Sequence, residues 1–231
     1  MSKNRYNQLF KVIKFQKPKT IVEVGTWSGE RALQLIQWAL QYTDHVTYYG
    51  FDLFEDATPE NDNKELNGKR THPSAAEVSA MLQAAKDYGL NFDFELHKGN
   101  TTDSLHVPDA PWRTADFAFI DGGHSVDTIR SDYEALKACK CIVFDDYYTP
   151  DKNGVIVPDT TKFGCNELAK TLQSCVILPS GDLQEGWGAI FMLVTPAHAN
   201  PFPVNFQVKT RNCVDNDIIH SNIRYSLPFT K

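Results

Sequence analysis

The chain has 231 residues, a formal net charge of −6, and 42% hydrophobic and 23% charged residues. These values are typical of a globular protein and argue against a general nucleic-acid surface, which needs an excess of basic residues. No apolar run approaches the ~20 residues of a membrane span. The N-terminus is basic, and Lys11 and Lys14 interrupt its apolar residues, so it lacks a signal-peptide core. The five cysteines form no C-x-x-C pair, so we expect reduced thiols in a cytoplasmic protein.

Apolar runs alternate with helical patterns, which predicts a parallel sheet with crossover helices in one domain. We expect an N-terminal helix within residues 1–19, a core over 20–194 and a C-terminal extension over 195–231. The predicted strands are Thr20–Val24, Val46–Asp52, Phe92–Lys98, Ala115–Asp121, Cys141–Asp145, Ser174–Leu178 and Gly188–Val194. Helical spacing of apolar residues is found at Tyr6, Phe10 and Ile13, at Leu33, Ile36 and Leu40, at Val78, Met81, Leu82 and Ala85, at Ile129, Tyr133 and Leu136, and at Leu168 and Leu172.

Two segments interrupt the alternation. Residues 54–73 are polar and rich in Asn, Asp, Glu and Lys, and residues 149–164 contain two prolines and two glycines. Both follow the carboxyl ends of predicted strands, where open α/β sheets bind their ligands. We expect both to be lid or acceptor loops over a binding site; the alternative is a pair of surface insertions without a function.

The stretch IVEVGTWSGE, residues 21–30, predicts a strand that ends in a tight turn before a helix. Glycine at such a turn permits the bend and the approach of a ligand to free backbone N–H groups. The dinucleotide fingerprint G-x-G-x-x-G is absent, because Trp27 occupies the position of its second glycine. Glu23 would repel a diphosphate, but it suits a ligand with a cationic group such as an amine or a sulfonium.

With these features the chain resembles the class I S-adenosylmethionine-dependent methyltransferases, whose E/D-x-G-x-x-x-G loop corresponds to Glu23, Gly25 and Gly29. Asp52 ends the second predicted strand, where the resemblance implies an acidic residue whose carboxylate accepts hydrogen bonds from both ribose hydroxyls. Taken alone, Asp52 would be interpreted as a turn residue at the end of a strand. The resemblance implies a cofactor site formed by Glu23, Gly25, Thr26, Trp27, Gly29, Asp52, Leu53, Asn100, Thr101 and Asp121. It also implies a Rossmann-like, doubly wound α/β fold with seven mostly parallel strands, the last antiparallel.

The segments FIDGGHS and FDDY place Asp121, Asp145 and Asp146 at neighbouring strand ends. Three close carboxylates repel one another unless a cation neutralises them, and Mg²⁺ readily takes carboxylate oxygens. The segments resemble the metal-dependent O-methyltransferases, including the macrocin-type sugar O-methyltransferase group, in which aspartates here bind the metal. Alternatively, Asp121 caps a helix and the other two lie in a solvated turn. His124 is a candidate catalytic base together with Asp121, or a metal ligand, or a loop residue.

The leading hypothesis is S-adenosylmethionine-dependent, Mg²⁺-dependent (or other divalent-cation-dependent) O-methylation of a small phenol, catechol or sugar hydroxyl. The alternatives are a metal-independent N- or C-methyltransferase, a nucleotide-dependent oxidoreductase, a metal hydrolase, and a binding protein that keeps the cofactor site. We expect a small-molecule acceptor as the partner, with no nucleic acid and no membrane, and a homodimer is a further possibility.

Overall fold

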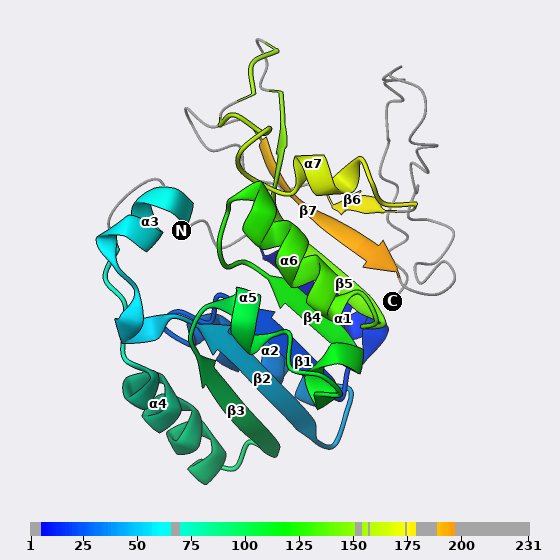
Figure 1. Ribbon diagram of the computed structural model, residues 1–231. Helices are drawn as coiled ribbons and strands as arrows, with labels where there is room; N and C mark the ends of the chain where they lie inside the picture. Colours follow the sequence, from blue (N-terminus) through cyan, green and yellow to red (C-terminus); the bar gives the residue numbers. More distant parts are fainter. Residues whose placement is uncertain are drawn as a thin grey trace, which may run out of the picture.

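The computed structural model describes residues 6–65, 70–150, 154–156, 158–173, 175–178 and 189–196, which form one sheet covered by helices on both faces (Figure 1). The strands are β1 (Thr20–Val24), β2 (Val46–Asp52), β3 (Phe92–Lys98), β4 (Phe117–Ile120), β5 (Cys141–Thr149), β6 (Val176–Leu178) and β7 (Ala189–Pro196). Their order is β3-β2-β1-β4-β5-β7-β6. The first five strands in this order, β3-β2-β1-β4-β5, are parallel. β7 pairs antiparallel with β5 and β6. The expected α/β, Rossmann-like fold is confirmed.

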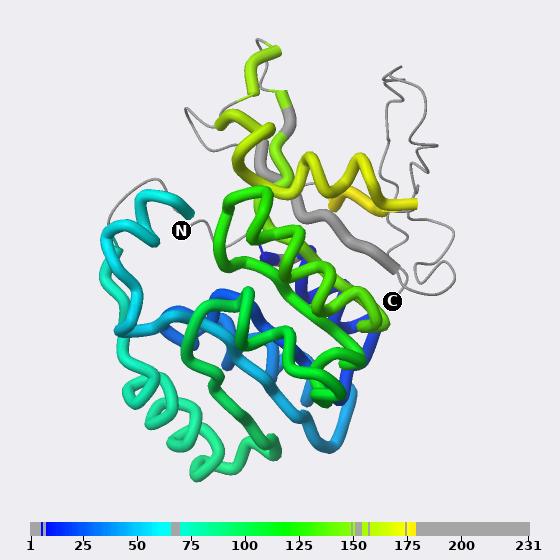
Figure 2. Tube along the Cα trace, in the orientation of Figure 1, coloured from blue at the N-terminus to red at the C-terminus, as the bar shows by residue number. Residues whose placement is uncertain are grey.

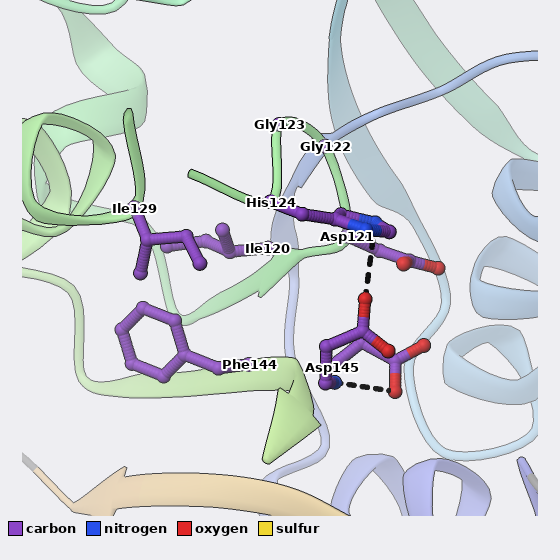
Figure 3. Close-up of a pocket in the computed structure, with 9 residues that line it drawn as sticks. Ile120, Asp121, Gly122, Gly123, His124, Ile129, Phe144 and Asp145 are labelled. Atoms are coloured by element: carbon purple, nitrogen blue, oxygen red, sulfur yellow. Dashed lines mark hydrogen bonds and ion pairs between the residues drawn. The ribbon is translucent and has the colours of Figure 1, made fainter. Parts of the chain in front are cut away.

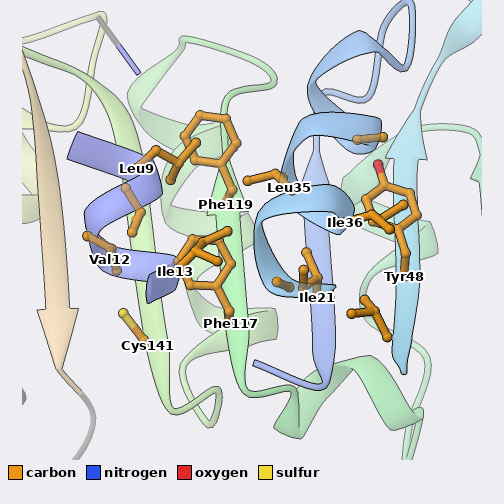
Figure 4. Packing of buried hydrophobic residues seen from close by; sticks show 14 of the residues in the cluster. Leu9, Val12, Ile13, Ile21, Leu35, Ile36, Tyr48, Phe117, Phe119 and Cys141 are labelled. Carbon is orange, nitrogen blue, oxygen red and sulfur yellow. The ribbon is translucent and has the colours of Figure 1, made fainter. Parts of the chain in front are cut away.

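Two buried clusters occupy the two faces of the sheet. The first lies beneath α1 (Asn7–Gln16), α2 (Glu30–Leu40) and α4 (Ala75–Asp87). The second lies beneath the 3₁₀ turn η2 (Pro111–Thr114), α6 (Val126–Leu136) and α7 (Asn166–Ala169), with α5 (Thr101–Ser104) beside α6. Figure 4 shows Leu9 and Ile13 of α1 packed against Phe117 and Phe119 of β4. All four β4 residues are buried, as expected for a parallel strand covered on both faces.

The first three strands have the predicted bounds, but the later strands differ from the prediction. β6 begins at Val176, and β7 continues to Pro196, into the range predicted as a C-terminal extension. β4 is shorter than Ala115–Asp121 at both ends. Just before its start, the carboxylate of Asp116 accepts hydrogen bonds from the backbone N–H groups of Lys19 (2.8 Å) and Thr20 (3.0 Å). β5 continues to Thr149 and changes its register with β7 between Phe144 and Tyr147. This irregularity lies at the two aspartates that the sequence singled out.

The predicted lid over residues 54–73 contains short helices rather than loop alone. They are the 3₁₀ turn η1 (Phe54–Asp56) and α3 (Pro59–Glu65), in which Pro59 suits the first helical position. Figure 2 shows α3 on the side of the sheet where the parallel strands end, apart from the two main layers. Residues 66–69, parts of the predicted loop 149–164, and the extension from 197 onward lie outside the described residues. No described helix is long and apolar enough to cross a membrane.

Candidate functional site

A cavity of about 500 Å³ lies at the carboxyl ends of the parallel strands. It is bounded by the turn after β1, the end of β2, residues of 61–65 and 70–72, the start of α5 and the loop after β4. The predicted site residues that line it are Gly25, Thr26, Trp27, Asp52, Leu53, Asn100, Thr101, Asp121, His124 and Asp146. Glu23, Gly29 and Asp145 were also predicted but do not line this cavity.

The turn between β1 and α2 requires its two glycines. Gly25 and Gly29 have φ angles of 89° and 74°, which side chains rarely adopt. A Cβ atom on Gly25 would lie 2.1 Å from the backbone oxygen of Asp121, and one on Gly29 would lie 2.8 Å from Val78 Cγ1. The predicted bend is therefore present. What these glycines allow to approach closely is the rest of the same chain. The turn lies between the residue that follows β4 and helix α4, with no room for a side chain.

Asp52 organises the backbone at the mouth of this turn. Its Oδ2 accepts a hydrogen bond from the Trp27 N–H (2.8 Å), and its Oδ1 accepts one from the Phe54 N–H (2.7 Å). Each carboxylate oxygen has a second lone pair, so Asp52 keeps the capacity to accept hydrogen bonds from a ligand in the cavity. The Trp27 indole donates to the Thr71 oxygen (2.9 Å), which ties the turn to the far end of the predicted lid.

Glu23 lies beneath the turn and is fully buried. Its Oε2 accepts a hydrogen bond from the Tyr48 hydroxyl (2.5 Å), and burial raises the pKa of its carboxyl group to about 8. This carboxyl group therefore faces the interior of the fold. A contact between Glu23 and a cationic part of a ligand stays a prediction.

Asn100 and Thr101 stand where β3 gives way to α5. The Asn100 side chain caps this short helix, because its Oδ1 accepts a hydrogen bond from the Thr102 N–H (3.1 Å). Both residues line the cavity on the Asp52 side, where β2 and β3 pair in parallel. They are available as polar contacts at that end.

Asp121, His124 and Asp146 meet at the other end of the cavity. One ligand atom from each lies within 4.8 Å of the others, which is a spacing that a single metal ion can bridge. The pairing of Ile120 at the end of β4 with Phe144 of β5 places the following residues of both strands next to each other and so brings these residues together. His124 Nε2 lies 3.0 Å from Asp146 Oδ2, the ion pair drawn as a dashed line in Figure 3.

The backbone irregularity in β5 decides which aspartate joins this group. Asp146 has a φ angle of 59°, which side-chain-bearing residues rarely adopt. Asp145 turns back instead, so that its Oδ1 accepts a hydrogen bond from the Asp146 N–H (2.9 Å). The group thus differs from the predicted metal set of Asp121, Asp145 and Asp146, with His124 in place of Asp145.

Opposing effects act on the pKa of His124. Burial lowers the pKa of the imidazole, but the charges of Asp146 and Asp145 and the hydrogen bond to Asp146 outweigh burial. The net result is a pKa above the ordinary histidine value. The His124 imidazole, paired with Asp146, is therefore suited to accept a proton and to retain it.

Several residues that line the cavity were not assigned to the site from the sequence, and five of them carry polar or charged groups that contact one another or the candidate metal group. Glu65, Asp62 and His72 come from the polar segment that was interpreted only as a lid, and Arg70 lies among them. Tyr6 comes from the turn before α1, and its hydroxyl lies 3.4 Å from Asp145 Oδ2 and 3.5 Å from Asp121 Oδ2. The density of charged residues in 54–73 was a signal, but the contacts of Glu65 with Ser125 and Thr128 join parts of the chain that are 60 and 63 positions apart.

Comparisons with known proteins agree with the fold and name its class. A family model described as a methyltransferase domain matches residues 22–147, more than half of the chain. A search of the curated proteins found no matching sequence.

Solved structures of low sequence identity share the fold. The O-methyltransferase TomG of Streptomyces achromogenes, involved in tomaymycin synthesis and solved with S-adenosylmethionine, has a TM-score of 0.55 and 16% identity, covering 85% of this chain and 81% of that one. The O-methyltransferase of Bacillus cereus, solved with S-adenosylhomocysteine, has a TM-score of 0.55 and 15% identity, covering 84% and 81%. The methyltransferase domain of bacterial CtHen1-CN has a TM-score of 0.50 and 10% identity, covering 83% and 96%.

Proposed function

Because the chain belongs to the methyltransferase-domain family and is therefore an S-adenosylmethionine-dependent methyltransferase, we propose that it methylates a hydroxyl oxygen of a small acceptor with the help of Mg²⁺ or another divalent cation. The observation that carries this proposal is the group of Asp121, His124 and Asp146. It lies in the same cavity as the turn after β1 and Asp52, so that a cation site and a cofactor site would adjoin.

The cavity fits the cofactor in chemistry and size. At about 500 Å³ it has room for a ligand of this class and leaves space for a small acceptor. We assign the ribose hydroxyls to the free lone pairs of Asp52, the adenine end to Asn100 and Thr101, and the methionine end to the turn at Gly25, Thr26 and Trp27. The cofactor supplies the electrophilic methyl group.

The three-residue group fits a divalent cation by its donor set. Two carboxylates are ligands that Mg²⁺ prefers, whereas an imidazole beside them also suits Mn²⁺ or Fe²⁺. A bound cation would lower the pKa of the acceptor hydroxyl. Within this scheme Asp121 and Asp146 hold the charge, and His124 either completes the ligand set or takes the hydroxyl proton.

The contact between His124 and Asp146 also supports a second candidate, transfer without a metal. A carboxylate 3.0 Å from the imidazole nitrogen orients the ring and stabilises its protonated form, as a general base requires. The oxidoreductase and hydrolase alternatives do not agree with the family match.

A transfer assay with labelled S-adenosylmethionine distinguishes the two candidates. The acceptors would be catechol, a simple phenol and glucose, each tested with Mg²⁺ and with a chelator. The proposal predicts product with Mg²⁺ and at least tenfold less after chelation. Equal rates in both conditions would favour the base-only candidate and contradict the role of the metal.

A further inference from the structure

Residues 70–72 are fixed over the cavity by contacts to each residue in turn. The Arg70 N–H donates to Asp62 Oδ2 (2.9 Å), and His72 Nε2 lies 2.8 Å from Asp62 Oδ1. The Thr71 oxygen accepts the hydrogen bond from the Trp27 indole (2.9 Å). Asp62 is only 4% exposed, and both its oxygens serve this segment. The backbone here is therefore held in place by a buried carboxylate and by the cofactor-side turn.

The side chain of Arg70 differs from the other cationic side chains that line the cavity. Lys64 Nζ pairs with Glu65 (2.9 Å), and the Arg31 guanidinium lies 3.3 Å from the ring centroid of Tyr6. Within the described part of the chain, no hydrogen bond, ion pair or ring contact engages the Arg70 guanidinium. The carboxylates of Asp62 and Glu65, both from the same segment, are occupied by His72 and by Ser125 and Thr128.

Arg70 lines the same cavity as Asp121, His124 and Asp146. An acceptor whose hydroxyl reaches these three residues would thus share the cavity with a guanidinium that has no hydrogen bond or ion pair among the described residues. Guanidinium groups bind carboxylates and phosphates through paired hydrogen bonds, and they do so best when the surrounding backbone is rigid.

We propose that residues 70–72 form a subsite for an anionic group of the acceptor, a carboxylate or a phosphate, with the Arg70 guanidinium as its partner. Asp62 acts as a positioning residue for this subsite through its contacts to Arg70 and His72. This inference rests on the proposed function, since it assumes that the acceptor occupies the same cavity as the cofactor. Residues 70–72 of the predicted lid would then select a charged acceptor.

The test is calorimetric binding to the full chain saturated with S-adenosylhomocysteine and Mg²⁺. The probes are 3,4-dihydroxybenzoate beside catechol, and glucose 6-phosphate beside glucose. We expect at least one anionic probe to bind about tenfold more tightly than its neutral counterpart, and the pair that responds identifies carboxylate or phosphate as the group recognised.

Variants identify the side chain responsible. R70Q is expected to abolish the preference for the anionic probe, and D62N to reduce it, with unchanged affinity for S-adenosylhomocysteine in both. R130Q, which removes an exposed guanidinium of α6 outside the cavity, is the matched control and should keep the preference. Equal affinity for anionic and neutral probes, or a preference that survives R70Q, would overturn the inference. Absence of S-adenosylhomocysteine binding by the unmodified chain would instead overturn the proposed function.

Discussion

Asp132 of α6 is a buried carboxyl group that the proposed chemistry does not use. It is fully buried. Burial raises its pKa from 3.8 to about 7, although the nearby Thr101 hydroxyl lowers it. The folded state therefore binds this proton more tightly than the unfolded chain does. Its contribution to stability is complete below about pH 4 and is lost as the pH rises through about 7.

We therefore predict that D132N stabilises the protein at pH 8 and has little effect at pH 4. The expected gain in the free energy of unfolding at pH 8 is on the order of 2–4 kcal/mol, because the variant removes the cost of a buried negative charge. Urea unfolding at the two pH values measures it. D127N, at an exposed position of the same helix, is the control. An equal effect of D132N at both pH values would show that Asp132 does not titrate as described.

Single residues also show where prediction from sequence stops. Asp52, Asn100 and Asp121 lie at the ends of regular strands, so their convergence on one cavity follows from the order of a parallel sheet. Asp145 and Asp146 lie in the register shift of β5, and alternation along a strand does not tell which of them faces the site. Their orientation depends on the left-handed backbone of Asp146, for which an aspartate gives no strong signal.

At the scale of elements, Glu65 connects α3 to the start of α6. Its carboxylate accepts hydrogen bonds from the Ser125 N–H (2.9 Å), the Ser125 hydroxyl (3.0 Å) and the Thr128 hydroxyl (2.9 Å). Burial raises the pKa of Glu65, but the contacts with Lys64, Ser125 and Thr128 outweigh it and lower the pKa below its usual value. The charge of Glu65 thus stabilises the amino-terminal end of α6 and holds the lid segment next to His124.

Replacement of this carboxylate should destabilise the fold. We predict that E65A costs about 2 kcal/mol, because it leaves partly buried donors without an acceptor, and this corresponds to a fall in Tm of roughly 4–8 °C for a chain of this size. Calorimetric melting measures the change. E60A, which removes an exposed carboxylate of the same helix, should leave Tm within about 1 °C. Equal melting of the two variants would mean that α3 is not anchored through Glu65.

The core strands and the predicted lid differ in how well the sequence predicts their structure. Strands such as Val46–Asp52 carry a local signal in their apolar and β-branched residues, and their bounds were predicted correctly. The segment 54–73 has no such periodicity, since α3 is polar along its length. Its described residues are instead held by distant contacts. Glu65 contacts Ser125, 60 positions away, and Thr71 contacts Trp27, 44 positions away.

For the molecule as a whole, the sheet order assigns the two halves of the cavity to different strands. β1, β2 and β3 end at the turn, Asp52 and Asn100, whereas Asp121 and His124 follow β4 and Asp146 lies at the irregularity within β5. Cofactor and metal would thus be held by separate elements. Loss of one ligand should therefore leave the other bound.

The most direct test is a titration of Mn²⁺ into the full chain, followed by electron paramagnetic resonance, with S-adenosylhomocysteine binding measured on the same samples. We expect one Mn²⁺ site in the unmodified chain and at least tenfold weaker Mn²⁺ binding in D146N. The affinity for S-adenosylhomocysteine should be unchanged within about twofold. If D146N binds Mn²⁺ as tightly as the unmodified chain does, Asp121, His124 and Asp146 are not a metal site, and the metal-dependent mechanism is wrong.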